Sequence, residues 1–160
     1  MRRILLPMDD RNHADRAAWV VREWLRRDVR LRVEILYVTE IVSAGRSRGP
    51  RLPMSYEREV AQQIQQRMEQ EVFRDWRSRV QFHHKTGPSV SQVICQIAEL
   101  LACDTIVLGG EPMRGLRRWV GGSIAHAVLT RTSASVFVVR PETVGSVHPV
   151  PFSRHPHRAE

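Results

Sequence analysis

The residues best suited to chemistry lie in one glycine-rich and arginine-rich segment between residues 108 and 123. It starts with Gly109-Gly110 after an apolar run and ends with Gly121-Gly122-Ser123. Glycines let the backbone approach a ligand closely, and the free amides at the start of a following helix attract anions. Arginines inside the segment add positive charge: Arg114, Arg117 and Arg118. The pattern indicates a phosphate-binding loop, although a tight connection with a solvated basic surface would have the same composition.

Further candidate residues stand where other apolar runs end. Pro7-Met8-Asp9 closes the first run, and Val38 closes the second. In an open parallel sheet, ligands bind beyond the carboxyl ends of the strands, near the point where the strand order reverses. We therefore expect these residues to line one edge of a sheet together with Leu108 and Gly109.

No arrangement of side chains in the sequence points to catalysis or to a metal site. The glycine-rich segment matches neither the P-loop nor the dinucleotide fingerprint. His126 has no acidic residue at triad-like spacing, and His83-His84 is more typical of a strand end than of a ligand pair. Cys95 and Cys103 match no zinc or redox spacing, which favours two buried thiols in a reducing compartment. We expect a binding protein rather than an enzyme, with at most weak ATP hydrolysis.

Alternating strand and helix patterns must position these candidates. Apolar runs predict strands within residues 1–10, 31–38, 80–84, 104–109 and 135–139. Apolar residues at helical spacing predict helices near residues 14–25, 55–79, 90–101 and 123–131. This succession is typical of an α/β domain with an open, all-parallel five-stranded sheet, in the order 3-2-1-4-5, and helices on both faces.

The composition of the chain also suggests its boundaries. Residues 1–140 carry the alternating pattern and are predicted to form a single domain. Residues 40–54 hold glycines, prolines and three arginines, which predicts a mobile loop. Residues 141–160 are rich in proline and histidine without periodicity, which is typical of a disordered tail.

The charge of the chain favours acidic partners. It has 160 residues, a formal net charge of +8 and a sequence pI of about 11.0. The arginine groups at 46–51 and 114–118 have few aromatic residues among them, which favours a solvated surface over a nucleic-acid site. No apolar run approaches the roughly 20 residues that a membrane span needs, and the first residues do not form a signal peptide. We expect a cytoplasmic protein.

The same segments resemble the universal stress protein family, whose nucleotide loop has the signature G-x2-G-x9-G-[ST]. Gly109 matches the first glycine and Gly122-Ser123 match the closing pair, whereas Pro112 occupies the second glycine position. Other features typical of the family are Ile4-Leu5-Leu6-Pro7-Met8-Asp9, Leu36-Tyr37-Val38, Gly87-Pro88 and Ser135-Val136-Phe137-Val138-Val139-Arg140. The resemblance covers about residues 1–140 and supports the predicted fold.

The resemblance implies a ligand and a role for each matched residue. In relatives that bind ATP, the positions of Asp9 and Val38 hold the adenine, those of Leu108 and Gly109 flank the ribose, and those of Gly122, Ser123 and Ile124 hold phosphates. The expected cofactor is ATP or another adenine nucleotide, with Mg²⁺ if it binds. Pro112 opposes this expectation, because proline has no amide to offer a phosphate and has a fixed negative φ.

The resemblance also implies a stress-response regulatory domain that acts on a protein partner not identified by the sequence. The last predicted strand contains the apolar residues Val136 to Val139 and lies at an edge of the sheet. Pairing with a second copy would cover that edge, so we expect a homodimer. The alternative to nucleotide-dependent regulation is a dimeric interaction protein that works without nucleotide.

Overall fold

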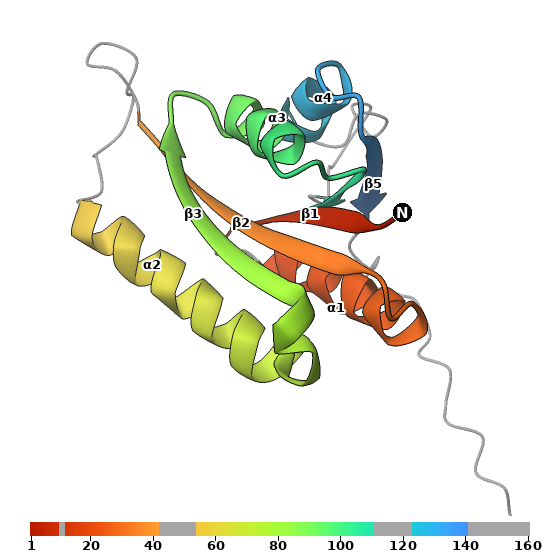
Figure 1. The fold of residues 1–160 in the computed structure, drawn as a ribbon. Helices are drawn as coiled ribbons and strands as arrows, with labels where there is room; N and C mark the ends of the chain where they lie inside the picture. Colours follow the sequence, from red (N-terminus) through yellow and green to blue (C-terminus); the bar gives the residue numbers. More distant parts are fainter. Residues whose placement is uncertain (10–11, 42–53, 111–122, 141–160) are drawn as a thin grey trace, which may run out of the picture.

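A computed structural model describes residues 1–9, 12–41, 54–110 and 123–140 of the chain (Figure 1). Its elements in chain order are β1 (Arg3–Met8), α1 (Asn12–Arg27), β2 (Arg32–Glu40), α2 (Met54–Arg67), η1 (Met68–Val72), η2 (Arg74–Arg79), β3 (Val80–Gly87), α3 (Val90–Leu100), β4 (Thr105–Gly109), α4 (Ser123–Leu129) and β5 (Ser135–Val139). The predicted alternation of strands and helices is confirmed. Most of the predicted 40–54 loop and all of the predicted 141–160 tail lie outside the described residues.

The five strands form one parallel sheet in the order β3-β2-β1-β4-β5, as predicted. Figure 1 shows α1 and α2 on one face of the sheet and α3 and α4 on the other. Each connection between parallel strands must cross a face of the sheet. The strands in the middle are therefore covered on both sides, which explains their nearly continuous apolar sequences.

Alternation along the strands divides the buried side chains into two clusters. The cluster under α1 and α2 includes these strand residues: Ile4, Leu6, Met8, Val33, Ile35, Tyr37 and Val107. The cluster under α3 and α4 includes Leu5, Leu36, Ile106 and Leu108 from the strands. Each fully buried large aliphatic side chain contributes about 1.5–3 kcal/mol relative to exposure. A slip of one residue in any strand would exchange the two sets, so burial fixes the register.

The second predicted helix, over residues 55–79, differs from the structure. The α-helix ends at Arg67, a π-helical turn follows over Met68–Val72, and a 3-10 segment leads into β3. Apolar residues repeat here every four positions, whereas an α-helix turns every 3.6 residues, so their stripe would wind away from the sheet. The wider π turn, closed by a 2.8 Å bond from the Phe73 amide to the Met68 carbonyl, keeps both residues buried.

Two arginines stabilise helix ends on opposite faces of the sheet. The Arg79 guanidinium donates to the carbonyls of Leu25 (3.1 Å) and Asp28 (2.8 Å) at the end of α1. The Arg3 guanidinium donates to the Leu101 carbonyl (2.6 Å) after α3. The last carbonyls of a helix have no partner within the helix and carry partial negative charge, so both contacts are favourable.

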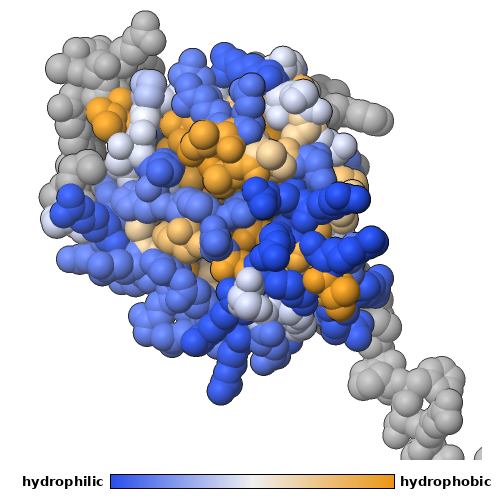
Figure 2. All heavy atoms as spheres, in the orientation of Figure 1, coloured by the Kyte–Doolittle hydropathy of each residue, from blue (hydrophilic) through white to orange (hydrophobic). Residues whose placement is uncertain are grey.

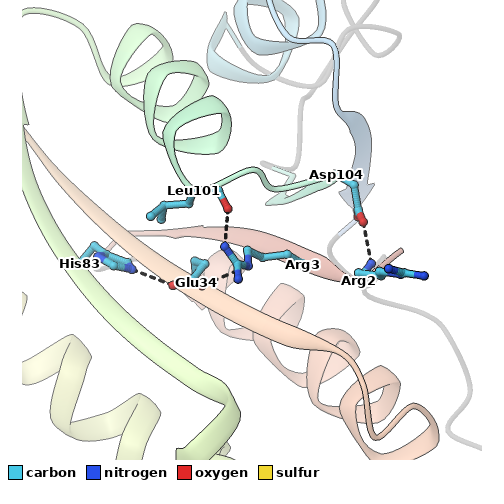
Figure 3. A network of polar contacts seen from close by, with 6 residues as sticks. All are labelled: Arg2, Arg3, Glu34, His83, Leu101 and Asp104. Atoms are coloured by element: carbon cyan, nitrogen blue, oxygen red, sulfur yellow. Dashed lines mark hydrogen bonds and ion pairs between the residues drawn. The ribbon is translucent and has the colours of Figure 1, made fainter.

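A carboxylate is buried within the central part of the sheet. Glu34 on β2 is 5% exposed, and one of its carboxylate oxygens lies 2.8 Å from His83 Nε2 (Figure 3). The other oxygen lies 3.7 Å from Arg3 Nε.

Cys103, on the same side of the sheet, is also buried. Desolvation, with a smaller contribution from the nearby Glu34 charge, raises the pKa of its thiol to about 12.

We predict that Glu34→Gln destabilises the fold by about 1–3 kcal/mol, because it removes a buried charge-assisted acceptor from two basic partners. Urea unfolding monitored by circular dichroism measures the change. The matched control is Glu40→Gln, which alters an exposed carboxylate on the same strand. Equal stability of the two variants would show that the Glu34 contacts contribute nothing.

Candidate functional site

The sheet separates at its carboxyl edge, between β1 and β4. Paired residues between these strands are Ile4 with Thr105 and Leu5 with Ile106, and the pairing stops there although β1 continues to Met8 and β4 to Gly109. By contrast, β1 stays paired with β2 as far as Met8. This point is also where the strand order reverses, which is the usual place for a ligand in an open α/β sheet.

Several residues predicted for the site lie at this carboxyl edge. Leu108 and the half-buried Val38 both pack on the α3/α4 side of the sheet. Met8, the last residue of β1, packs on the α1/α2 side of the sheet. Pro7 is half-buried and Asp9 is exposed just beyond the strand. The edge therefore combines an apolar surface with an accessible carboxylate.

The end of β4 requires glycine at one position. The Gly110 amide donates to the Val139 carbonyl at 2.8 Å, which keeps the two strand ends together. A Cβ atom at Gly110 would lie 3.1 Å from Val138 Cγ1 and 3.2 Å from the Val139 oxygen, closer than most real contacts. Gly109, the first glycine of the motif, ends β4 beside Val139 and is half-buried. The absence of a side chain at Gly109 and Gly110 thus lets the chain leave β4 in close contact with β5.

The phosphate side of the predicted site is only partly described. Ser123 begins α4, as the sequence predicts, and Ile124 is 44% exposed on that helix. The remaining predicted residues of this side lie outside the described residues: Pro112, Arg114, Arg117, Arg118 and Gly122. Their contribution to the site stays a prediction from the sequence.

Charges near Asp9 affect the first turn of α1. Burial raises the pKa of Asp15, and the negative charges of Asp9 and Glu71 raise it further. The Arg67 guanidinium opposes this effect and forms an ion pair of 2.8 Å with Asp15. This pair links α1 to the end of α2 and offsets part of the acidic charge around Asp9.

A polar cluster that the sequence analysis missed lies beside Val38, on the α1/α2 side of the sheet. The Glu57 carboxylate, from the first turn of α2, accepts hydrogen bonds from the hydroxyls of Tyr37 (2.7 Å) and Thr39 (3.3 Å). His84 Nε2 lies 2.8 Å from the Thr39 hydroxyl. Because that hydroxyl donates to Glu57, it accepts from His84, which places a proton on Nε2. Only the polar residues at alternate positions of β2 hinted at this cluster.

The described residues contain no group of three or more His, Cys, Asp or Glu side chains that could hold a metal ion. Both cysteines are free thiols, and burial raises the pKa of Cys95 as well as that of Cys103. No helix within the described ranges is long and apolar enough to cross a bilayer.

The chain belongs to the universal stress protein family, whose model matches residues 1–140. The resemblance inferred from the loop and strand motifs is thereby confirmed, and with it the assignment to a family of stress-response proteins. None of the curated proteins compared with this chain matches it significantly.

Solved structures share the fold at low sequence identity. A universal stress protein from Lactobacillus plantarum is 19% identical, with a TM-score of 0.63, over 86% of this chain and 97% of that one. One from Burkholderia pseudomallei is 18% identical, with a TM-score of 0.62, over 86% and 95%. A universal stress protein solved in complex with cAMP is 11% identical, with a TM-score of 0.58, over 87% and 96%.

The cluster around Thr39 predicts a pH dependence of stability. Desolvation lowers the pKa of His84 from its ordinary value of 6.5, with Glu57 opposing the shift and Arg58 adding to it. An unfolded chain therefore binds more protons at this residue than the folded chain does, so stability is lost as the pH falls through 6.5 and below.

We expect His84→Gln to reduce this loss, because the glutamine amide still donates to Thr39 but does not titrate. Urea unfolding of wild type and variant at about pH 7.5 and at about pH 5.5 measures this loss of stability. His126→Gln, at an exposed position of α4, is the control. Parallel losses of stability in wild type and His84→Gln would contradict the assignment.

Proposed function

We propose that this universal stress protein is a stress-response regulatory domain that binds an adenine nucleotide at its carboxyl edge. The separation of β1 from β4 carries the proposal, because the ends of these two strands are not paired with each other where the strand order reverses. ATP is the expected ligand, and occupancy of the site would change which protein partner the domain contacts.

The described part of the edge suits an adenine base. Val38 and Leu108 provide apolar surface on one side of the sheet, and the half-buried Pro7 stands between their strands. The exposed Asp9 carboxylate is an acceptor for the amino group of adenine. The backbone of Val38, at the end of a paired strand, is held in place by the neighbouring Thr39 and Glu57 contact. A family structure in complex with cAMP supports the same class of ligand.

The phosphates would extend from this edge toward the start of α4, where the family motif places Gly122 and Ser123. Mg²⁺ prefers phosphate oxygens, water and one or two carboxylates. Mg²⁺ would therefore arrive with the triphosphate, whose oxygens are among its preferred ligands. It would supply neutralisation of phosphate charge, while residues of this chain orient the base.

We predict that ATP raises the thermal unfolding midpoint of the full chain. A ligand at 100 times its dissociation constant adds roughly 2.7 kcal/mol, and two-state domains of this size shift by roughly 2–4 °C per kcal/mol. Thermal titrations with ATP and ADP, each with and without magnesium, provide the measurement.

The Asp9→Ala variant is expected to bind ATP more weakly by about 0.5–1.5 kcal/mol, the value of one hydrogen bond.

Asp75→Ala, which removes an exposed carboxylate on η2, is the matched control and should bind as wild type does. A midpoint that no nucleotide changes would reject the proposed function. Equal weakening by the two alanine substitutions would instead assign the effect of Asp9 to net charge.

A second candidate, a dimer that works without nucleotide, has one observation in its favour. β5 is an outer strand of the sheet, and its Phe137 and Val138 are 47% and 37% exposed. Phe137 also contacts Trp24 of α1 edge to face at 5.4 Å between ring centres, which extends the apolar surface. Outer strands with exposed apolar residues tend to pair with another chain. A homodimer through Val136 to Val139 would cover this surface.

For this candidate we predict that Val138→Arg converts a dimer into a monomer, because pairing would bury an unpaired charge. Light scattering at micromolar protein concentration gives the mass. Leu100→Arg is the control, since Leu100 is 75% exposed on α3, away from β5. A monomeric wild type would contradict the dimer.

A further inference from the structure

The amino edge of the sheet, opposite the candidate nucleotide site, is rich in arginine. Arg3 on β1 is in register with Arg32 on β2, and the Arg32 amide donates to the Arg2 carbonyl. β3 begins beside them, with Val33 in register with Val80. Arg2 and Arg32 are both exposed. Positive charge is therefore presented where three adjacent strands begin.

The end of α1 extends this edge. Arg79, just before β3, binds the carbonyls of Leu25 and Asp28, and so fixes the last turn of α1 beside the strand starts. The exposed Arg26 and Arg30 belong to this end of α1 and the turn that follows. Figure 2 shows mostly hydrophilic side chains on the side of the molecule where β1 begins and α1 ends.

Two tryptophans contact a further arginine of α1, Arg22. The Arg22 guanidinium carbon lies 4.8 Å from the centre of the Trp19 ring and 5.4 Å from that of the Trp76 ring. Trp19, Arg22 and Arg26 follow one stripe of α1, at spacings of three and four residues. Trp19 is nevertheless 46% exposed. The Arg22 guanidinium stacks over the Trp19 ring, and the exposed part of that indole is available to a further group.

Nearby carboxylates neutralise only part of this charge. Glu23 pairs with Arg26 at 3.1 Å, and Asp28 pairs with Arg30 at 3.7 Å. Asp104 accepts a hydrogen bond from the backbone amide of Arg2, which leaves that guanidinium to the solvent side. The surface keeps a positive balance and offers arginines, whose planar groups match phosphate oxygens well.

We propose that the surface formed by Trp19, Arg22, Arg26, Arg30, Arg32 and Trp76 binds single-stranded nucleic acid. An unpaired base stacks on the open Trp19 ring, and the arginines beyond it contact successive phosphates. A duplex hides its base faces and could not use the ring. The arginine groups at 46–51 and 114–118 are different residues, and they lack the aromatic side chains that distinguish this surface.

A single strand fits this surface better than an anionic membrane does. Besides Met1 before β1, at 55%, the large apolar side chains exposed among the described residues near this surface are Trp19 and Val29, at 46% and 79% exposure. They are separated by about 15 Å along α1 and its turn, at 1.5 Å per helical residue. Membrane insertion needs a broader apolar face on a helix, whereas stacking needs one open ring with charge beside it.

The first test is the affinity of the full chain for a fluorescently labelled oligouridylate, measured by anisotropy at several salt concentrations. Trp19→Ala should weaken binding about tenfold, the loss expected for one stacked base. Tyr56→Ala is the matched control, because Tyr56 is 44% exposed on α2 and far along the chain from this surface. An oligothymidylate should bind similarly, since stacking and phosphate contacts are common to both.

Arg30→Glu provides a second, independent test at an exposed turn. It should weaken binding and reduce the slope of log K against log salt by about 0.7 for each lost phosphate contact. Arg58→Glu changes charge equally at an exposed position of α2 and should leave the slope unchanged. Unchanged thermal unfolding midpoints would confirm that every variant is folded.

Any one of four results would overturn the proposal. The oligonucleotides could fail to bind, or bind equally well to Trp19→Ala. Excess ATP could displace them equally well from wild type and from Trp19→Ala, which would locate binding at the carboxyl edge. Vesicles containing phosphatidylglycerol could bind while oligonucleotides do not, which would assign the arginines to a membrane. The proposed nucleotide function is tested separately, because its ligand and its Asp9→Ala variant concern the opposite edge.

Discussion

The parallel direction of all five strands is the constraint on which the rest of this molecule depends. Every connection must return across a face of the sheet, so α1 and α2 cover one side and α3 and α4 the other. All carboxyl ends then gather at one edge and all amino ends at the opposite one. The separation of β1 from β4 and the row of arginines at the strand starts are two results of this geometry.

The strands and their order could be predicted because apolar runs and alternation are local properties of the sequence. Placing Val38 and Leu108 on one side of the sheet also requires only alternation. The π turn after Arg67 could not be predicted, because it reconciles a four-residue repeat with a sheet that the sequence does not display. The contact of Glu57 with Thr39 joins residues on opposite sides of a long connection, so only the folded chain reveals it.

A high arginine content has several separate uses in this protein. Arg3 and Arg79 neutralise helix ends and belong to the fold, and Arg67 pairs with the half-buried Asp15 on α1. Net charge alone therefore overstates the charge available to partners. What identifies a binding surface is the combination of arginine with an open indole ring, as at Trp19 and Arg22. That combination depends on the contact between α1 and η2, which composition does not reveal.

The two cysteines have a consequence for oxidative signalling. Peroxides attack the thiolate, and a pKa of about 12 leaves roughly one Cys103 side chain in a hundred thousand ionised at pH 7. Cys95 is shifted in the same direction. Neither sulfur is suited to form a sulfenic acid quickly, and both are free rather than paired. An oxidant that acts through thiolates would therefore modify these two cysteines only slowly.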